Sequence, residues 1–253
     1  MDPIVMVHGA FVGGWSFEQF RKPFEAAGHH VLAPDLRGHA AGQASEQVVG
    51  VSIRDYADDI ATLCASLATP PILIGHSMGG LVAQLAARRA APKALVLLAP
   101  SPPWGLAGWS VEEAFTAFGA QMASLLSNGA VEPSREVMRS ASLSRMTRAD
   151  AEPILDRLRP ESAQAVRETL NWWLDPFMTT SIGSGPLPVR SLVISGEADM
   201  VHPAASGRLV AERIGGDFIS LPEMSHWLLG EPGWEEVAEV ALEFIGREAR
   251  AAA

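Results

Sequence analysis

Residues 71–80 read Pro-Ile-Leu-Ile-Gly-His-Ser-Met-Gly-Gly, so a short apolar run leads directly into a Gly-x-Ser-x-Gly motif, and a helical pattern follows. In a strand–turn–helix setting this motif forms a sharp turn that exposes the serine at the end of the strand. Side chains at Gly75 and Gly79 would collide with the neighbouring elements. The free N–H groups of the new helix favour negative charge above Ser77. We therefore predict that Ser77 is a nucleophile.

Five further apolar runs have the length of strands. Their patterns are continuous rather than alternating, as in strands that are covered on both faces. These runs are residues 4–7, 30–33, 94–98, 191–194 and 217–221. Helical patterns lie between them, at residues 15–27, 52–68, 77–91, 203–214 and 232–247. Alternating strands and helices predict an α/β fold with a mostly parallel sheet.

The segment from Ser101 to Pro186 breaks this alternation. Its patterns are helical throughout, with no strand-like run among them, at residues 111–127, 133–142, 148–158 and 161–174. We therefore predict a core domain, residues 1–100 and 187–253, with a helical lid, residues 101–186, inserted in it.

A serine hydroxyl needs a base that accepts its proton. His226 follows the last strand-like run and precedes the final helix, which places it at the same sheet edge as Ser77. His202 also follows a strand-like run and is the main alternative. Asp199 is expected to orient the base, with Glu197 as its alternative, because both follow the strand-like run before the last one.

A glycine-rich stretch, His8-Gly-Ala-Phe-Val-Gly-Gly-Trp15, follows the first strand-like run. Glycine-rich backbone at this point lets N–H groups face the reaction centre. We expect the N–H groups of Ala10 and Met78 to form an oxyanion hole. A plain strand–helix turn is the alternative interpretation of this stretch.

The other histidines are expected outside the chemistry. His8 should brace the glycine-rich loop, and His76 should point away from the reaction centre. His39, like His29 and His30, is expected on the surface or in a loop.

Several motifs together resemble the α/β-hydrolase superfamily. They are His8-Gly9, residues 34–39 (Pro-Asp-Leu-Arg-Gly-His), residues 75–80, residues 196–199 (Gly-Glu-Ala-Asp) and Ser225-His226. The resemblance covers nearly the whole chain except the lid, and it implies the α/β-hydrolase fold. That family often begins with an antiparallel hairpin before the His-Gly strand. Because this chain starts at that strand, we expect a sheet of about six strands.

The run from His8 to Phe17 is also similar to the plant methylesterase and hydroxynitrile lyase group. The lyases of that group carry a threonine in the first loop and a lysine after the catalytic histidine. This chain has Gly9 and Trp227 at those places, so the resemblance favours esterase chemistry. Ser77 excludes the aspartate nucleophile that related hydrolases use.

The sequence therefore predicts a carboxylesterase that forms an acyl-enzyme on Ser77. A lactonase, a thioesterase, a carbon–carbon bond hydrolase and a perhydrolase would share its triad, and a slow-turnover binding protein or receptor is the alternative of another class. An apolar substrate pocket is expected, and a short, medium-chain or aromatic ester would suit it. Aromatic candidates for its lining are Phe11, Trp104, Trp109, Trp172 and Trp227. Packing of lid helices onto the core is an equal alternative for the lid tryptophans.

Composition limits the partners. The 253 residues carry a net charge of −10, which argues against nucleic acid and anionic membrane surfaces. The sequence contains no metal-binding or dinucleotide motif, so no metal or cofactor is expected. It has no apolar run of roughly 18 residues, and its first strand-like run begins too early for a signal peptide. We expect a cytoplasmic monomer or homodimer, with a secreted chain that has lost its signal as the alternative.

Overall fold

A six-stranded sheet forms the centre of the molecule, and all its strands run parallel. The computed structural model describes residues 1–106, 111–127 and 129–251. The order of the strands across the sheet is β2-β1-β3-β4-β7-β8, which confirms the predicted sheet. The strands are β1 (Ile4–Val7), β2 (Val31–Leu32), β3 (Ile72–His76), β4 (Ala94–Leu98), β7 (Ser191–Gly196) and β8 (Asp217–Leu221).

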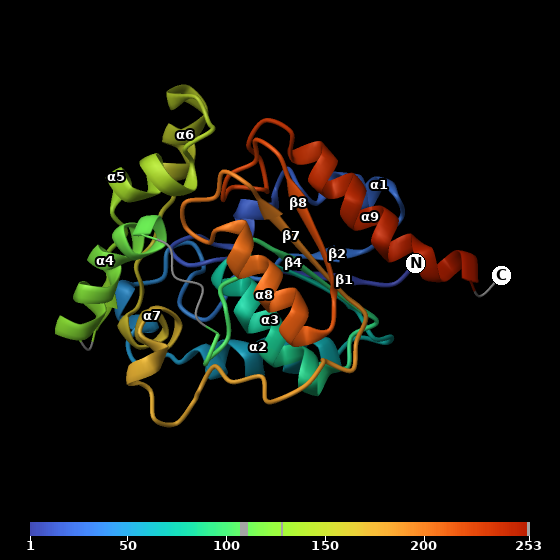
Figure 1. Cartoon of the computed structure of the whole chain (residues 1–253), viewed down its shortest axis with the longest axis horizontal. Helices are drawn as coiled ribbons and strands as arrows, with labels where there is room; N and C mark the ends of the chain where they lie inside the picture. Colours follow the sequence, from blue (N-terminus) through green and yellow to red (C-terminus); the bar gives the residue numbers. More distant parts are fainter. Residues whose placement is uncertain (107–110, 128, 252–253) are drawn as a thin grey trace.

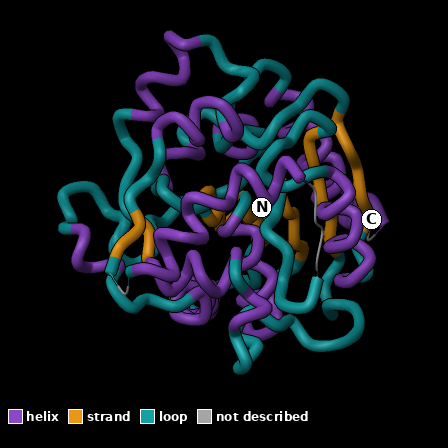
Figure 2. Tube along the Cα trace, turned by 60° about the vertical axis from the view of Figure 1, so that its left-hand side comes forward, coloured by secondary structure: helices purple, strands orange, loops and turns teal. Residues whose placement is uncertain are grey.

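Helices cover both faces of this sheet (Figures 1 and 2). Successive side chains of a strand point to opposite faces. Ile4 therefore packs in one apolar cluster with Phe244, and Val5 packs in the other with Leu81. The first face is covered by α1 (Lys22–Ala26) and α9 (Trp234–Ala251), and the second by α2 (Ile53–Ala65), α3 (Met78–Ala90) and α8 (Ala204–Ile214). Because both faces are apolar, the strands read as continuous apolar runs.

The first predicted helix is divided in two. A short 3-10 helix, η1 (Gly14–Phe17), precedes α1, which starts only at Lys22. Pro23 stands at the beginning of α1. Proline has no N–H to donate to the preceding turn and is accommodated best in a first turn, so one helix through residues 15–27 does not form.

The segment between β4 and β7 lies at one end of the sheet (Figure 1). Most of it is helical, as expected, but it also contains a short antiparallel ladder in which Val131 pairs with Glu161. The prediction of a segment without strands was therefore wrong, because Glu161 and Ser162 are both polar and the two residues that pair with them, Ala130 and Val131, form no longer apolar run. The elements are α4 (Val111–Leu126), β5 (Ala130–Val131), α5 (Arg135–Val137), η3 (Met138–Ser142), α6 (Arg148–Leu155), β6 (Glu161–Ser162), α7 (Ala163–Leu170) and η4 (Trp172–Leu174).

A remaining 3-10 helix, η2 (Ser45–Val48), lies between β2 and α2. Ser52 then caps the start of α2 with its side chain, together with Asp55. Among the described residues, no helix combines the length and the apolar character that crossing a bilayer requires.

Candidate active site

Ser77 occupies a strained turn between β3 and α3. Its backbone has φ 54° and ψ −125°, a conformation that L-residues rarely adopt and that costs on the order of 1–3 kcal/mol. The flanking glycines allow the close packing that holds this turn. A Cβ atom on Gly75 would lie 2.5 Å from the carbonyl oxygen of Gly79, and one on Gly79 would lie 2.2 Å from that of Val7. The turn therefore requires glycine at both positions.

His226 and Asp199 are joined at the carboxyl edge of the sheet. His226 Nδ1 lies 2.9 Å from Asp199 Oδ2, and both side chains are buried. The second oxygen of Asp199 accepts hydrogen bonds from the backbone N–H groups of Val201 and His202. Burial opposes ionisation of Asp199, but its interactions with His226 and the hydrogen bond from His202 outweigh it, so the pKa of Asp199 lies below its ordinary value.

The sequence alternatives for the acid and the base, Glu197 and His202, have other side-chain partners. Glu197 is exposed, and its carboxylate accepts a hydrogen bond from the hydroxyl of Ser220. His202 Nε2 lies 2.9 Å from Ser101 Oγ. The side-chain contact with the imidazole of His226 is thus made by Asp199 rather than Glu197, and the imidazole that Asp199 holds is that of His226 rather than His202.

Ser77 and His226 line one cavity of about 130 Å³, which lies between the sheet edge and the inserted segment. Ala10 and Met78, the expected oxyanion residues, line it too. Because Asp199 engages Nδ1 of the imidazole, Nε2 is the ring nitrogen that can accept a proton. Four of the five residues expected at the reaction centre thus face one space, and the fifth holds the imidazole.

His8 holds the loop that carries Ala10. The N–H of Leu36 donates to His8 Nε2 at 2.9 Å, which leaves Nδ1 to donate to the carbonyl of Gly9 at 2.8 Å. Burial, together with the neighbouring His39, lowers the pKa of His8 to about 3. His8 is therefore a neutral brace with a fixed tautomer.

His76 lies at the site, contrary to the expectation that it points away from the reaction centre. It lines the cavity, and its Nε2 donates to the backbone carbonyl of His226 at 2.9 Å. Burial, with the nearby His226, lowers the pKa of His76 to about 3, so it is neutral. The motif position gave no signal for this role, because the contact joins residues that are distant along the chain.

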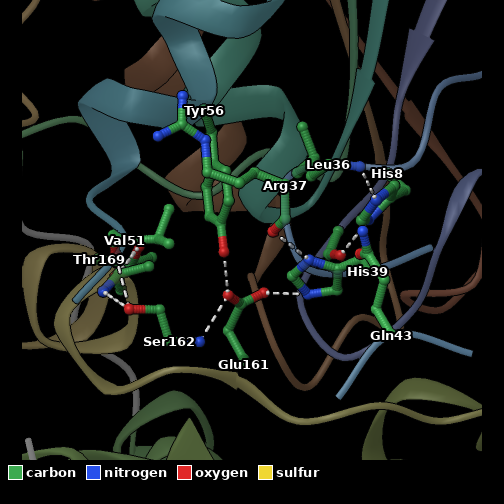
Figure 3. Close-up of polar contacts among 12 residues, drawn as sticks. His8, Leu36, Arg37, His39, Gln43, Val51, Tyr56, Glu161, Ser162 and Thr169 are labelled. Carbon is green, nitrogen blue, oxygen red and sulfur yellow. Dashed lines mark hydrogen bonds and ion pairs between the residues drawn. The ribbon is translucent and has the colours of Figure 1, made fainter. Parts of the chain in front are cut away.

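The inserted segment is attached to the core by a buried carboxylate, that of Glu161 (Figure 3). Tyr56 Oη and the N–H of Ser162 each donate to its Oε1 at 2.7 Å. His39 Nε2 lies 3.1 Å from its Oε2, and the ring of His39 lies 5.1 Å from that of His8. His39 lies in a loop, one of its two expected places, but its side chain is buried beside Glu161, which the sequence did not indicate.

The expected pocket residues separate into two groups. Phe11 and Trp227 line the cavity. Trp104 and Trp172 are not among the described residues that line the cavity. Their rings instead pack edge-to-face against each other, with 5.5 Å between the centroids, and Trp104 Nε1 donates to the backbone carbonyl of Asp175. Trp109 lies outside the described residues.

Most of the lid residues in the lining are aliphatic. The sequence candidates were aromatic, although the helical spacing of Val166 and Leu170 on α7 was a usable signal for two of these residues. The aliphatic lining residues are Ala120, Val137, Met138, Val166 and Leu170. Within the described part of the chain, no group of three or more His, Cys, Asp or Glu side chains could hold a metal ion.

A second, more open cavity of about 510 Å³ lies beside the first. It is formed by the 3-10 helix η1, the lid helix α6 and the loop before α9, and Arg157 and Glu231 are among its polar residues. Trp227 lines both cavities.

Known proteins share this sequence pattern in part and this fold over nearly its whole length. Methylesterase 7 of Arabidopsis thaliana is 36% identical over 86 residues, which are 33% of each chain. Salicylic acid-binding protein 2 of Nicotiana tabacum is 38% identical over 104 residues, which are 39% of each chain. The matched segments thus cover well under half of these curated relatives. The crystal structure of the methylesterase MES16 from Arabidopsis superposes with a TM-score of 0.74 at 19% identity, covering 97% of this chain and 99% of that one.

A family-wide comparison reaches further along the chain. The match to the family described as "Alpha/beta hydrolase family" extends over residues 4–240. It includes all six strands of the sheet, the inserted segment and the serine, acid and histidine at the sheet edge. The chain therefore belongs to the alpha/beta hydrolase family.

Proposed function

We propose that the protein hydrolyses carboxylic esters of small molecules through an acyl-enzyme formed on Ser77. The observation that carries this proposal is the 2.9 Å contact between His226 Nδ1 and Asp199 Oδ2 at the wall of a cavity that Ser77 also lines. A histidine that is held in one tautomer by a buried carboxylate is the base that a serine nucleophile needs. The names of the methylesterase relatives support an ester as the substrate class.

The proposed reaction has two steps. Ser77 Oγ attacks the ester carbonyl carbon while His226 Nε2 takes its proton, and the N–H groups of Ala10 and Met78 stabilise the oxyanion. His226 then gives this proton to the departing alkoxide, so the C–O bond breaks and the alcohol leaves. Water attacks the acyl-enzyme with His226 again as base, which releases the acid and restores Ser77. Asp199 stays ionised throughout and stabilises the imidazolium.

The size of the cavity favours a small acyl or alcohol group. An apolar cavity of about 150 Å³ holds one benzene molecule. The present cavity, about 130 Å³ and lined mainly by aliphatic and aromatic side chains, is of similar size. Short-chain or single-ring esters are therefore the proposed substrates.

The test is a comparison of wild type with Ser77→Ala on p-nitrophenyl acetate and butyrate. We expect a burst of nitrophenol in wild type and a loss of about 10⁴-fold or more in kcat for the variant. Ser66→Ala, on the exposed end of α2, is the control that should retain wild-type rates. Equal turnover by wild type and Ser77→Ala would remove Ser77 from the mechanism.

A panel of plain esters, lactones, thioesters and diketones then separates the enzyme classes that share the triad. The proposal expects the highest kcat/KM on plain esters. Stoichiometric acylation of Ser77 without turnover on any of them would instead indicate a binding protein.

A further inference from the structure

A second serine–histidine pair lines the same cavity. Ser101 Oγ lies 2.9 Å from His202 Nε2, and the two residues are 2% and 3% exposed. The ring of His202 contacts that of His226 edge-on, with 5.4 Å between their centroids. The N–H of Ser101 donates to the carbonyl of Ser77 at 3.0 Å. The pair is thus fixed directly beside both the expected nucleophile and the expected base.

The hydroxyl of Ser101 differs from the other non-catalytic hydroxyls of the cavity. Thr169 Oγ1 donates to the carbonyl of Ala165 in its own helix, and Ser142 Oγ contacts the sulfur of Met138 in the same way. The hydroxyl of Ser101 points across to another element. A hydroxyl has one donor and two acceptor positions, so one bond to an imidazole leaves it further hydrogen-bonding capacity.

The order of the strands indicates which part of an ester would meet this pair. Ser77 follows β3, the oxyanion loop follows β1 on one side of it, and Ser101 and His202 follow β4 and β7 on the other side. An ester group is planar, and its carbonyl oxygen points away from both of its substituents. With that oxygen toward Ala10, the substituents extend toward Ser101 and His202.

We propose that Ser101 and His202 form a polar subsite for a second, uncharged oxygen of the substrate, a hydroxyl or ketone carried near the ester. This inference rests on the proposed esterase function and specifies its substrate class. An uncharged group fits because none of the described lining residues is a lysine or arginine and most are apolar. An ester without a second oxygen would bury the hydroxyl of Ser101 with a hydrogen-bonding position unused. This cost disfavours binding of such an ester.

The test uses matched substrates that differ in one oxygen. Methyl 3-hydroxybutyrate is compared with methyl butyrate, and 2-hydroxyethyl butyrate with propyl butyrate, so that the acyl and alcohol sides are probed separately. The measured quantity is the ratio of kcat/KM for the oxygenated ester to that for its plain partner. Changes in the nucleophile or base affect both esters and cancel in this ratio.

In wild type we expect at least one ratio to exceed one. In Ser101→Ala that ratio is expected to fall by about tenfold, the loss typical of one hydrogen bond. Thr169→Val is the matched control, because its hydroxyl bonds within its own helix, and it should keep the wild-type ratio. His202→Phe is measured in parallel. It removes the imidazole that contacts Ser101, so it should lower the same ratio. It also tests the subsite if Ser101→Ala does not fold.

Two results would overturn the subsite. One is a wild type without preference for either oxygenated ester, and the other is an unchanged ratio in the folded variants. Either can occur while plain esters are hydrolysed, so the subsite can fail while the proposed function stands. A wild type that hydrolyses none of the four esters would overturn the proposed function itself and the subsite with it.

Discussion

His39 Nε2 lies 3.1 Å from Glu161 Oε2, and neither side chain has any exposure to solvent. The contact joins the loop after β2 to strand β6 of the inserted segment. Burial opposes the charge on both groups, but each charge stabilises the other. The pKa of His39 is therefore raised and that of Glu161 lowered relative to their ordinary values. This buried ion pair joins the inserted segment to the core close to the loop that carries Ala10, one of the two expected oxyanion residues.

Replacing Glu161 with glutamine should destabilise the protein strongly. Removing one partner of a buried ion pair typically costs about 3–5 kcal/mol, because the other charge stays buried without compensation. Denaturant unfolding of Glu161→Gln measures this loss. Glu132→Gln, an exposed carboxylate of the same segment, should stay within about 0.5 kcal/mol of wild type. Equal losses in the two variants would contradict a special role of Glu161.

The contribution of His39 to stability should depend on pH. The stabilisation from a raised histidine pKa is complete below the ordinary value of about 6.5 and is lost as the pH rises through the folded-state pKa. The free energy of unfolding of wild type minus that of His39→Gln should therefore shrink as the pH rises above about 6.5. The charges that set this pKa are Glu161, which raises it, and Arg159, which lowers it. Unfolding series at several pH values check the trend, and a constant difference would contradict it.

We expect Glu231 to matter for catalysis although it lies outside the proposed triad. Its buried carboxylate accepts hydrogen bonds from the N–H and the hydroxyl of Ser225, the residue before His226. A glutamine at this position places its NH₂ group against either the N–H or the hydroxyl of Ser225. Because two donors then face each other, we expect the loop to shift. We expect Glu231→Gln to lower kcat by about 10- to 100-fold, because a misplaced base loses rate steeply.

The matched control for Glu231 is Glu235→Gln, which removes an exposed carboxylate that borders the same open cavity. It should keep the kcat of wild type. A wild-type kcat in Glu231→Gln, measured on the same ester, would show that the loop holds its position without this carboxylate.

Gly9→Ala should impair the oxyanion loop. A Cβ atom at this position would lie 3.0 Å from Cβ of Ser77, so the loop or the serine must move. We expect a fall of about 10²-fold in kcat/KM, with the fold retained. Gly246→Ala, which meets nothing within 4 Å, is the control and should leave the kinetics unchanged. Steady-state kinetics on one ester measure both variants.

The sequence predicted those parts of the protein that depend on local patterns. The six strands could be identified because each is apolar on both faces, as Ile4 and Val5 show by packing into opposite clusters. The turn at Ser77 could be identified because steric limits require glycine around it. Asp199 and His226 could be placed near Ser77 because each follows a strand, and the carboxyl ends of parallel strands lie at the same edge of the sheet.

Features that depend on distant contacts escaped prediction. The pairing of His39 with Glu161 joins residues far apart along the chain, and neither side chain has a local pattern that indicates burial. Trp104 and Trp172 pack their rings against each other, and their positions along the chain do not indicate this contact. The contact of His76 with the backbone of His226 is of the same kind.

Trp227 lines both the cavity of about 130 Å³ and the more open cavity of about 510 Å³. We expect a small aliphatic residue in its place to connect these two cavities. Under the proposed function, we expect the range of substrates to depend on this side chain, which follows His226 directly in the sequence. Widening the range toward bulky esters would begin there, with no change to the sheet or to the turn that presents the serine.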